Sequence, residues 1–248
     1  MTFKNTYFLL IVIVTIVSPL NISAATQENT LTLDRQIANV RGLYSLYDGW
    51  DISLRASGSL SSQNALLLAQ VDKRLDKYWA DASSVITSDN NGVNLTVGVL
   101  AEISQQHGSA ASNRIHAWKR ISRLSKGLSE RDMLNQVNKF FNRLVFKSDQ
   151  ENWGRADYWA SPIEFLISNA GDCEDFAIAK YFTLKAMGVQ IERLRITYVK
   201  SERRNQAHMV LAYYEDPTKE PLILDNLTSK ILPATKRPDL TPVFSFNG

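Results

Sequence analysis

The stretch NAGDCEDFAIAKYF, Asn169–Phe182, joins a charged turn to an apolar run and contains the single cysteine of the 248-residue chain, Cys173. The three acids beside this thiol are Asp172, Glu174 and Asp175. Apolar residues on nearly every side predict a buried helix over residues 172–187, with Gly188 as its stop. At the first turn of that helix, unpaired N–H groups and the positive end of the helix dipole would favour a thiolate at Cys173.

The pattern changes from helices to strands around this stretch. The expected helices before residue 150 cover residues 33–46, 61–80, 97–117 (interrupted at Gly108-Ser109) and 132–146. The expected strands after it cover residues 194–200, 207–214 and 221–226. The turn signals around Asp216-Pro217 and Lys219-Glu220 predict that the last two strands pair antiparallel. Helices followed by one central helix and a sheet indicate an α+β fold.

Composition restricts the class of protein. The chain is 44% hydrophobic and 21% charged, with a formal net charge of +3. These are ordinary values for a globular protein of one large or two small domains. A nucleic-acid-binding surface would need clustered Lys and Arg, and no such run is present, so we expect no nucleic-acid partner.

The N-terminus has the organisation of a secretory signal. Lys4 precedes an apolar run over residues 7–17, Pro19 breaks that run, and small residues offer a cleavage site after Ala25. The run is shorter than the roughly 20 apolar residues of a membrane span. We therefore expect export to the periplasm with residues 1–25 removed; an uncleaved anchor is the alternative.

A lone cysteine in an oxidising compartment cannot form an internal disulfide, so it is either buried and inert or used. A nucleophilic thiol needs a base, and the chain has only three histidines. His208 begins an otherwise apolar strand, and the predicted hairpin brings it opposite residues around 225–228. Asp225 can therefore lie beside His208 and fix its tautomer.

Each of these residues has an ordinary structural explanation. A buried cysteine is most often a small hydrophobe, a strand histidine is often a satisfied core residue, and a carboxylate at a strand end is often a turn residue. The three occur together in the order cysteine on a helix, histidine on a strand and aspartate on the next strand. This combination favours catalysis by Cys173, His208 and Asp225.

Several segments resemble the bacterial transglutaminase-like cysteine proteinases, and within them the LapG-type periplasmic proteases. The matching segments are GDCEDFAIAKYFTLKAMG, LRITYVK, NQAHMVLAYY and PLILDNL, with WGRADYWASPIEFL upstream and RPDLTPVFSFN downstream. The resemblance covers roughly residues 115–248. It implies a papain-like or transglutaminase-like core in a protease domain over residues 111–248. The predicted signal peptide over residues 1–25 and a mostly helical extension over 26–110, which carries little of the resemblance, precede this domain.

The resemblance also implies roles for the residues. Cys173 would be the nucleophile, His208 the general base and acid, and Asp225 the residue that orients His208. The backbone N–H of Cys173 is a candidate oxyanion donor, since it lies at a helix start.

Two explanations remain for the acids around the thiol. By themselves, Asp172 and Asp175 favour helix capping, because carboxylates at a helix N-terminus accept N–H hydrogen bonds and favour the dipole. Clustered carboxylates also suit Ca²⁺. The LapG-type proteases are calcium-dependent, so the resemblance implies Ca²⁺ held by Asp172, Glu174 and Asp175.

The aromatic segment over residues 152–162 contains Trp153, Tyr158 and Trp159. It could form a substrate groove or a docking surface for a partner, which exposed aromatic side chains would favour. Plain core packing explains it equally well.

The function implied by the resemblance is a periplasmic calcium-dependent cysteine endopeptidase that cuts the N-terminal region of a large repeat-containing surface adhesin at a small-residue site and thereby releases a biofilm. A LapD-type inner-membrane receptor responsive to cyclic di-GMP would bind and sequester it. The alternatives are an amidase or acyltransferase on the same scaffold, and a non-catalytic periplasmic binding module with an inert Cys173.

Overall fold

The computed structural model describes residues 92–246, and the signal and helices predicted before residue 81 lie outside them. The helices are α3 (Val97–Ser122), α4 (Glu130–Phe141), α5 (Asp149–Trp153), α6 (Pro162–Ser168) and α7 (Cys173–Ala186), with 3-10 turns η1 (Ile191–Arg193) and η2 (Ala234–Lys236). The strands are β1 (Val145–Phe146), β2 (Ala170–Gly171), β3 (Leu194–Ser201), β4 (Gln206–Tyr213), β5 (Leu222–Leu224), β6 (Leu232–Pro233) and β7 (Leu240–Phe246). Among these residues no helix is both long and apolar enough to cross a membrane.

Five strands form an antiparallel sheet in the order β6-β5-β4-β3-β7. The predicted hairpin of β4 and β5 is confirmed, with Leu211 opposite Leu224 and Tyr213 opposite Leu222. Period-two alternation in β4 is confirmed as well. Met209, Leu211 and Tyr213 belong to the large core, whereas the intervening Val210 and Ala212 belong to a smaller cluster.

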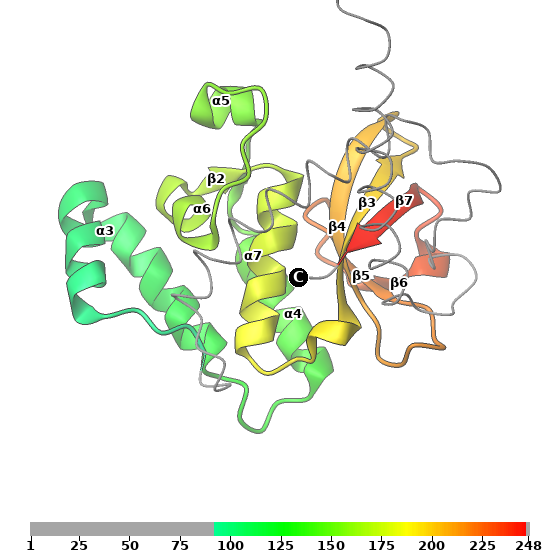
Figure 1. The fold of residues 1–248 in the computed structure, drawn as a ribbon, viewed down its shortest axis with the longest axis horizontal. Coiled ribbons are helices and arrows are strands. Elements are labelled where there is room, and N and C mark those ends of the chain that lie inside the picture. The colour runs from blue at the N-terminus through cyan, green and yellow to red at the C-terminus, as the bar shows by residue number, and fades with distance from the viewer. Residues whose placement is uncertain (1–91, 247–248) are drawn as a thin grey trace, which may run out of the picture. The chain divides into compact units, whose positions relative to one another are not determined.

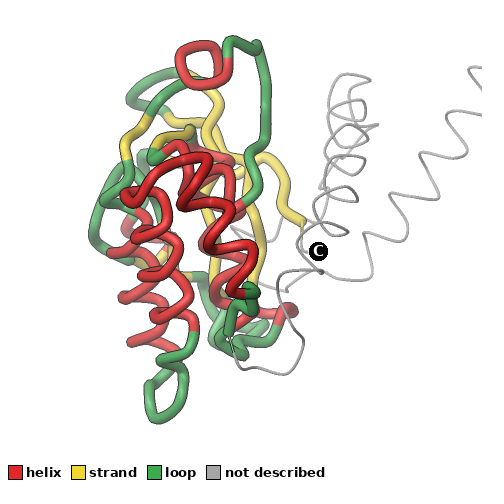
Figure 2. The backbone as a smooth tube through the Cα atoms, turned by 90° about the vertical axis from the view of Figure 1, so that its left-hand side faces the viewer, coloured by secondary structure: helices red, strands yellow, loops and turns green. Residues whose placement is uncertain are grey.

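The helices gather on one side of this sheet (Figure 1), and a view from the helical side shows them in front of the strands (Figure 2). Helix α7 lies against β4 and β3, and its side chains are buried on nearly every side, as predicted. The mixed helical and antiparallel architecture confirms the α+β prediction.

Side chains of helix α3 donate hydrogen bonds to helices α7 and α6. Trp118 Nε1 donates to Thr183 Oγ1 of α7 at 2.7 Å, and both groups are buried. Arg114 donates to the carbonyl oxygens of Leu166 and Ile167 near the end of α6 at 2.6 and 2.7 Å. The predicted interruption of this helix occurs at Gly108, which has a positive φ of 80°.

The prediction of a helix over residues 132–146 is wrong at the C-terminal end of that range. Helix α4 stops at Phe141, and Val145–Phe146 forms β1 instead, paired in parallel with β2. β-branched Val145 suits a strand, and the partner that fixes this strand lies 25 residues further along the chain. Helix α6 and strand β7 were not predicted.

Candidate active site

The local geometry around Gly171 places Cys173 at the start of α7. Asn169 adopts a left-handed conformation (φ 59°) that ends α6, and β2 follows at once. A Cβ atom at Gly171 would lie 2.3 Å from Asp175 Oδ2, so only glycine fits between β2 and the first turn of α7. The pairing of β2 with β1 then fixes the backbone that leads into Cys173.

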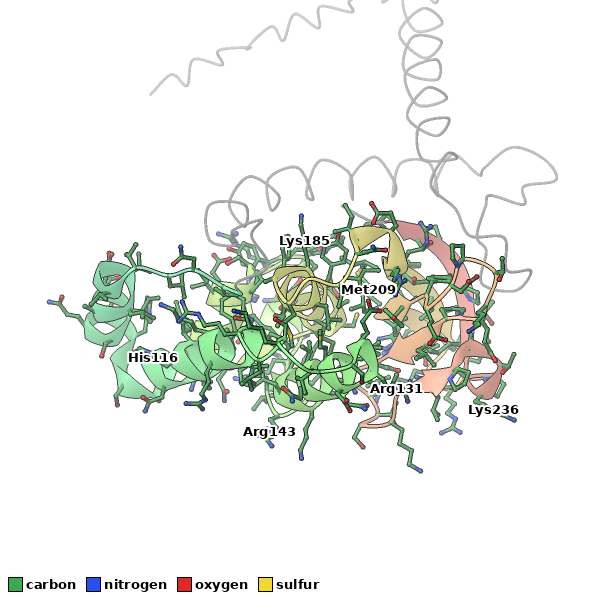
Figure 3. All side chains as sticks on the ribbon, turned by 90° about the horizontal axis from the view of Figure 1, so that it is seen from below. His116, Arg131, Arg143, Lys185, Met209 and Lys236 are labelled. Carbon is green, nitrogen blue, oxygen red and sulfur yellow. The ribbon has the colours of Figure 1, made fainter. Side chains whose placement is uncertain are left out.

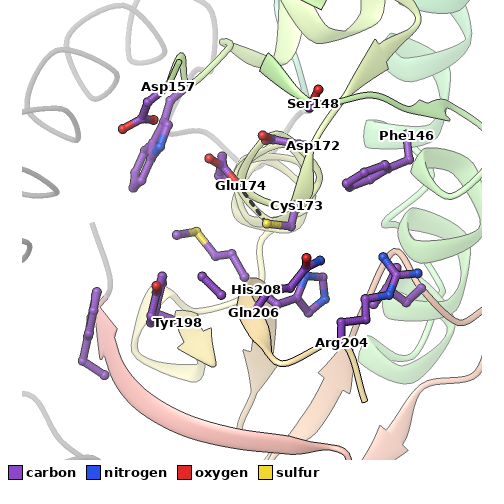
Figure 4. A pocket seen from close by; sticks show the side chains of 15 residues that line it. Phe146, Ser148, Asp157, Asp172, Cys173, Glu174, Tyr198, Arg204, Gln206 and His208 are labelled. Carbon is purple, nitrogen blue, oxygen red and sulfur yellow. Dashed lines mark hydrogen bonds between the residues drawn. The ribbon is translucent and has the colours of Figure 1, made fainter. Parts of the chain in front are cut away.

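Cys173 and His208 line one cavity of about 310 Å³, together with acidic, aromatic and polar side chains. In Figure 4 the thiol lies between Asp172 and Glu174 on one side and Gln206 and His208 on the other. The structure therefore brings the helix and the strand that carry the predicted nucleophile and base to the same cavity.

The imidazole of His208 is held by Asp225, as the hairpin register predicted. His208 Nε2 lies 2.8 Å from Asp225 Oδ1, and the two side chains are only 6% and 0% exposed. Since Asp225 engages Nε2, the remaining ring nitrogen, Nδ1, is the one left to act as a base.

Burial would raise the pKa of the Asp225 carboxyl, but its hydrogen bonds reverse that effect. Oδ1 also accepts the backbone N–H of Leu227 at 2.9 Å, and Oδ2 accepts from Arg237 Nη2 at 2.7 Å. Together with His208 these donors hold the pKa of Asp225 well below its usual range. These donors therefore favour the ionised form of the carboxylate in the folded protein.

The thiol of Cys173 donates to Glu174, with 3.0 Å between Sγ and Oε2. Burial, the charge and hydrogen bond of Glu174 and the charge of Asp172 raise the pKa of the thiol well above its usual value, while the backbone of Met209 opposes the rise. The repulsion expected from the acids is therefore present, and it adds to the effect of burial on the thiol pKa. Within residues 92–246 no hydrogen bond joins the thiol to His208.

Asp175 performs part of the capping role considered for these acids. Its Oδ2 accepts the backbone N–H of Asp172 at 3.3 Å, and its Oδ1 accepts that of Ala160 at 2.7 Å. Asp172 is the N-cap residue of α7, as predicted, but it makes no side-chain cap hydrogen bond, and its buried Oδ1 has no hydrogen-bond partner in the described part of the chain. Capping therefore accounts for Asp175 and leaves an oxygen of Asp172 unexplained.

The predicted calcium ligands fall into two acidic groups that share Asp149. In each group the carboxylate oxygens lie within 4.8 Å of one another. The first group is Asp149, Asp172 and Asp175, and the second is Asp149, Asp157 and Glu174. The sequence analysis missed Asp149 and Asp157. Asp149 lies on α5 and Asp157 in the following loop, and no motif fixes the spacing of either residue from the cysteine.

The protonation behaviour of these acids shows that the site is short of positive charge. Burial, followed by the charges of Glu174, Asp175 and Asp149, raises the pKa of Asp172 to about 10. Burial also raises the pKa of Asp175 to about 8, although its two backbone hydrogen bonds oppose this. Oxygen-rich ligands, a buried oxygen without a partner and uncompensated negative charge together fit a hard cation such as Ca²⁺.

The aromatic segment is mostly packing. The rings of Trp153 and Tyr158 lie 4.9 Å apart in a tilted contact on the edge of the core, and Tyr158 donates to Glu164 at 2.7 Å. Trp159 is buried in the core and also lines the cavity. The other two histidines lie on α3 away from the cavity; in Figure 3, His116 is well separated from Met209, the neighbour of His208.

Comparison with known proteins agrees with this geometry. The family description "bacterial transglutaminase-like cysteine proteinase BTLCP" matches residues 108–239. A search of curated proteins finds no match. Three structures of LapG from Legionella pneumophila are similar: an EGTA-treated form (TM-score 0.56, 82% of that chain covered), LapG without further description (0.56, 84%) and a calcium-bound form (0.55, 84%).

Each of these structures is 47% identical and aligns with 62% of the present chain. The matched segment of the family contains α7, which carries Cys173, and β4, which carries His208, and it includes Asp225 directly after β5. The protein therefore belongs to the bacterial transglutaminase-like cysteine proteinases.

Proposed function

We propose that this protein is a calcium-dependent cysteine endopeptidase that acts through Cys173, His208 and Asp225. One observation carries the proposal: Cys173 and His208 line one cavity, while Asp225 occupies Nε2 of His208 and leaves Nδ1 as the base. Membership of a cysteine proteinase family supports the same roles.

The proposed reaction runs through a thioester. His208 Nδ1 accepts the proton of the Cys173 thiol as sulfur attacks the carbonyl carbon of the peptide. The backbone N–H of Cys173, at the first position of α7, is placed to stabilise the oxyanion. The C–N bond then breaks and the imidazolium gives its proton to the departing amine. Water, deprotonated by His208, cleaves the thioester, which releases the carboxylic acid and restores the thiol.

The acids beside Cys173 explain why this chemistry would depend on a cation. Glu174 accepts the hydrogen bond of the Cys173 thiol and, with Asp172, opposes ionisation of the thiol. A Ca²⁺ ion held by Asp149, Asp157, Asp172, Glu174 and Asp175 would supply the positive charge that opposes this repulsion. The calcium-bound and EGTA-treated forms of LapG support calcium as the ion.

The biological setting is part of the same proposal. The N-terminal signal pattern supports export to the periplasm. As the resemblance of the sequence motifs implies, the proposed substrate is the N-terminal region of a large repeat-containing surface adhesin, cut at a small-residue site to release a biofilm. The proposed regulator is a LapD-type inner-membrane receptor for cyclic di-GMP.

The proposal is tested by incubating the protein with a recombinant N-terminal fragment of a large surface adhesin from the same genome, with calcium or with chelator. New peptide N-termini, identified by mass spectrometry, are expected only with calcium. Cys173→Ala should abolish them while the thermal unfolding midpoint stays similar. His116→Ala, on α3 outside the cavity, is the matched control and should cleave normally.

Three other outcomes would overturn the proposal. Incorporation of a fluorescent primary amine without new N-termini would identify an acyltransferase. Unchanged cleavage by Cys173→Ala would exclude a cysteine nucleophile. Absence of cleavage, together with alkylation of the single thiol only after unfolding, would favour a binding module with an inert cysteine.

A further inference from the structure

The second oxygen of the Asp225 carboxylate has a charged partner of its own. Oδ1 is shared by His208 and the Leu227 N–H, whereas Oδ2 accepts from Arg237 Nη2 at 2.7 Å. The Arg237 side chain is only 6% exposed. Each carboxylate oxygen is thus committed to different donors, which fixes the plane of the carboxylate as well as its charge.

Arg237 is itself held in place by a second acid. Its Nε lies 3.0 Å from Asp239 Oδ1, and its Nη2 lies 2.8 Å from Asp239 Oδ2. This paired contact uses the planar guanidinium in the fork geometry that a lysine cannot reproduce. The chain of contacts therefore runs from Asp239 through Arg237 and Asp225 to His208.

The fold brings this arginine to Asp225 from a separate segment. Arg237 ends the turn η2, where its N–H donates to the Ala234 carbonyl at 2.9 Å, and β7 begins three residues later. Its Nη1 is buried with no hydrogen-bond partner among residues 92–246. Burying a charged group with an unmet donor is unfavourable, so packing alone does not explain an arginine here.

We propose that Arg237 is a positioning residue for the reaction: by holding Oδ2 of Asp225, it keeps Oδ1 facing His208 Nε2 and so maintains Nδ1 as the nitrogen that serves Cys173. This inference rests on the catalytic roles proposed above. Without Arg237, rotation of the carboxylate would move its oxygens away from His208 Nε2, and the imidazole would lose the acceptor that fixes its tautomer and orientation.

Two side-chain donors contact Asp225 from different elements, and a third group, Lys180, interacts with it through charge. His208 reaches it from β4 and Arg237 from the segment after η2. Lys180 of α7 is buried, and burial lowers its pKa to about 7 while the charge of Asp225 opposes this. Replacing Arg237 removes the donor to Oδ2 and leaves His208 and the Leu227 N–H as donors to Oδ1, so the expected defect is one of orientation.

The test measures the tautomer of His208 by ¹⁵N NMR of the calcium-loaded protein, together with kcat and KM on the adhesin fragment. The chain has only three histidines, so His208→Ala assigns the signal. We expect one neutral tautomer, with the proton on Nε2, in the wild type. Arg237→Met should give a mixture of tautomers and a kcat lower by about 10- to 100-fold, with little change in KM. Arg237→Lys should recover only part of the loss.

Arg195→Met is the matched control, because Arg195 is a buried arginine of β3 that packs over Tyr214 and not on the triad. It should keep a single tautomer and a normal kcat, even if it lowers the unfolding midpoint. If Arg237→Met does not fold, Asp239→Asn takes its place, since the Asp239 side chain is 24% exposed and tolerates substitution better.

A single Nε2–H tautomer and an unchanged kcat in folded Arg237→Met, or in Asp239→Asn where it is the variant used, would overturn the inference. If the wild type does not cleave the fragment, the proposed function fails, but the tautomer measurement still decides whether Arg237 positions His208. If the wild type cleaves and only the tautomer and kcat predictions fail, the positioning role alone is wrong.

Discussion

Asp225 combines complete burial with a negative charge, which is unfavourable unless each oxygen finds a donor. His208, Leu227 and Arg237 provide these donors, and their effect on the pKa of the carboxyl exceeds that of burial. A group whose pKa is lower in the folded state than in the unfolded state stabilises the fold above its ordinary pKa and loses that contribution as pH falls.

The lowered pKa of Asp225 in the folded state leads to a prediction for Asp225→Asn. At neutral pH the variant should have a lower free energy of unfolding than the wild type, because the asparagine cannot satisfy His208 and Arg237 equally well. The difference should shrink as pH falls below about 4, the ordinary pKa of an aspartate, since the wild type must then bind a proton on unfolding. Urea unfolding at a series of pH values measures it. A difference that does not depend on pH would contradict an ionised Asp225.

Helix α4 holds the loop that follows Asp225 by hydrogen bonds from its polar face. Asn142 Nδ2 donates to the carbonyl oxygens of Asp225 and Thr228 at 2.8 and 3.0 Å, and Asn138 Nδ2 donates to Ser229 O at 3.3 Å. Arg131 Nη2 donates to Ile231 O at 3.1 Å. A helix before the cysteine and its C-cap residue Asn142 thus hold the backbone of Asp225, the residue that contacts His208.

Asn142→Ala should therefore affect both stability and the site. Two carbonyl oxygens lose their donor, so we expect the free energy of unfolding to fall by about 1–3 kcal/mol, measured with urea. Cleavage of the adhesin fragment should fall as well, because the Asp225 backbone is released. The exposed Gln106→Ala on α3 is the control and should change stability by no more than about 0.5 kcal/mol. Equal effects of the two substitutions would show that α4 does not support the loop.

At the scale of the whole molecule, the acidic groups join segments that are distant in sequence. Asp149 belongs to α5, Asp157 to the following loop, and the remaining acids to the start of α7. A cation at this position would connect the segment after β1 to the helix that carries the nucleophile. It would stabilise the folded state by mass action, because the unfolded chain does not hold the acids together.

Calcium should accordingly raise the thermal unfolding midpoint, and chelator should lower it again. At a free concentration about 100 times the Kd, the expected stabilisation is about 2.7 kcal/mol. Asp149→Asn should reduce the calcium-dependent shift most, since Asp149 belongs to both groups. Asp132→Asn, an exposed acid of α4, is the control and should keep the full shift. A midpoint that does not respond to calcium would contradict the proposed ion site.

Much of the fold followed from local patterns. The helix over residues 172–187, its glycine stop and the paired strands after it were predicted to within a few residues, because apolar periodicity and turn residues act locally. The proximity of His208 and Asp225 followed from the length of one hairpin. The end of α4 was not predictable in the same way, because Val145–Phe146 takes its partner from the segment before Cys173.

The sequence by itself determined the central helix, the hairpin beside it and the order of Cys173, His208 and Asp225 on these elements, since each depends on neighbours along the chain. Only the tertiary structure decided that Asp149 and Asp157 join the acids at Cys173, and that Arg237 and Asn142 hold Asp225. These contacts join segments from distant parts of the chain. Their geometry depends on packing and chain closure over long loops, which no local periodicity or motif spacing encodes.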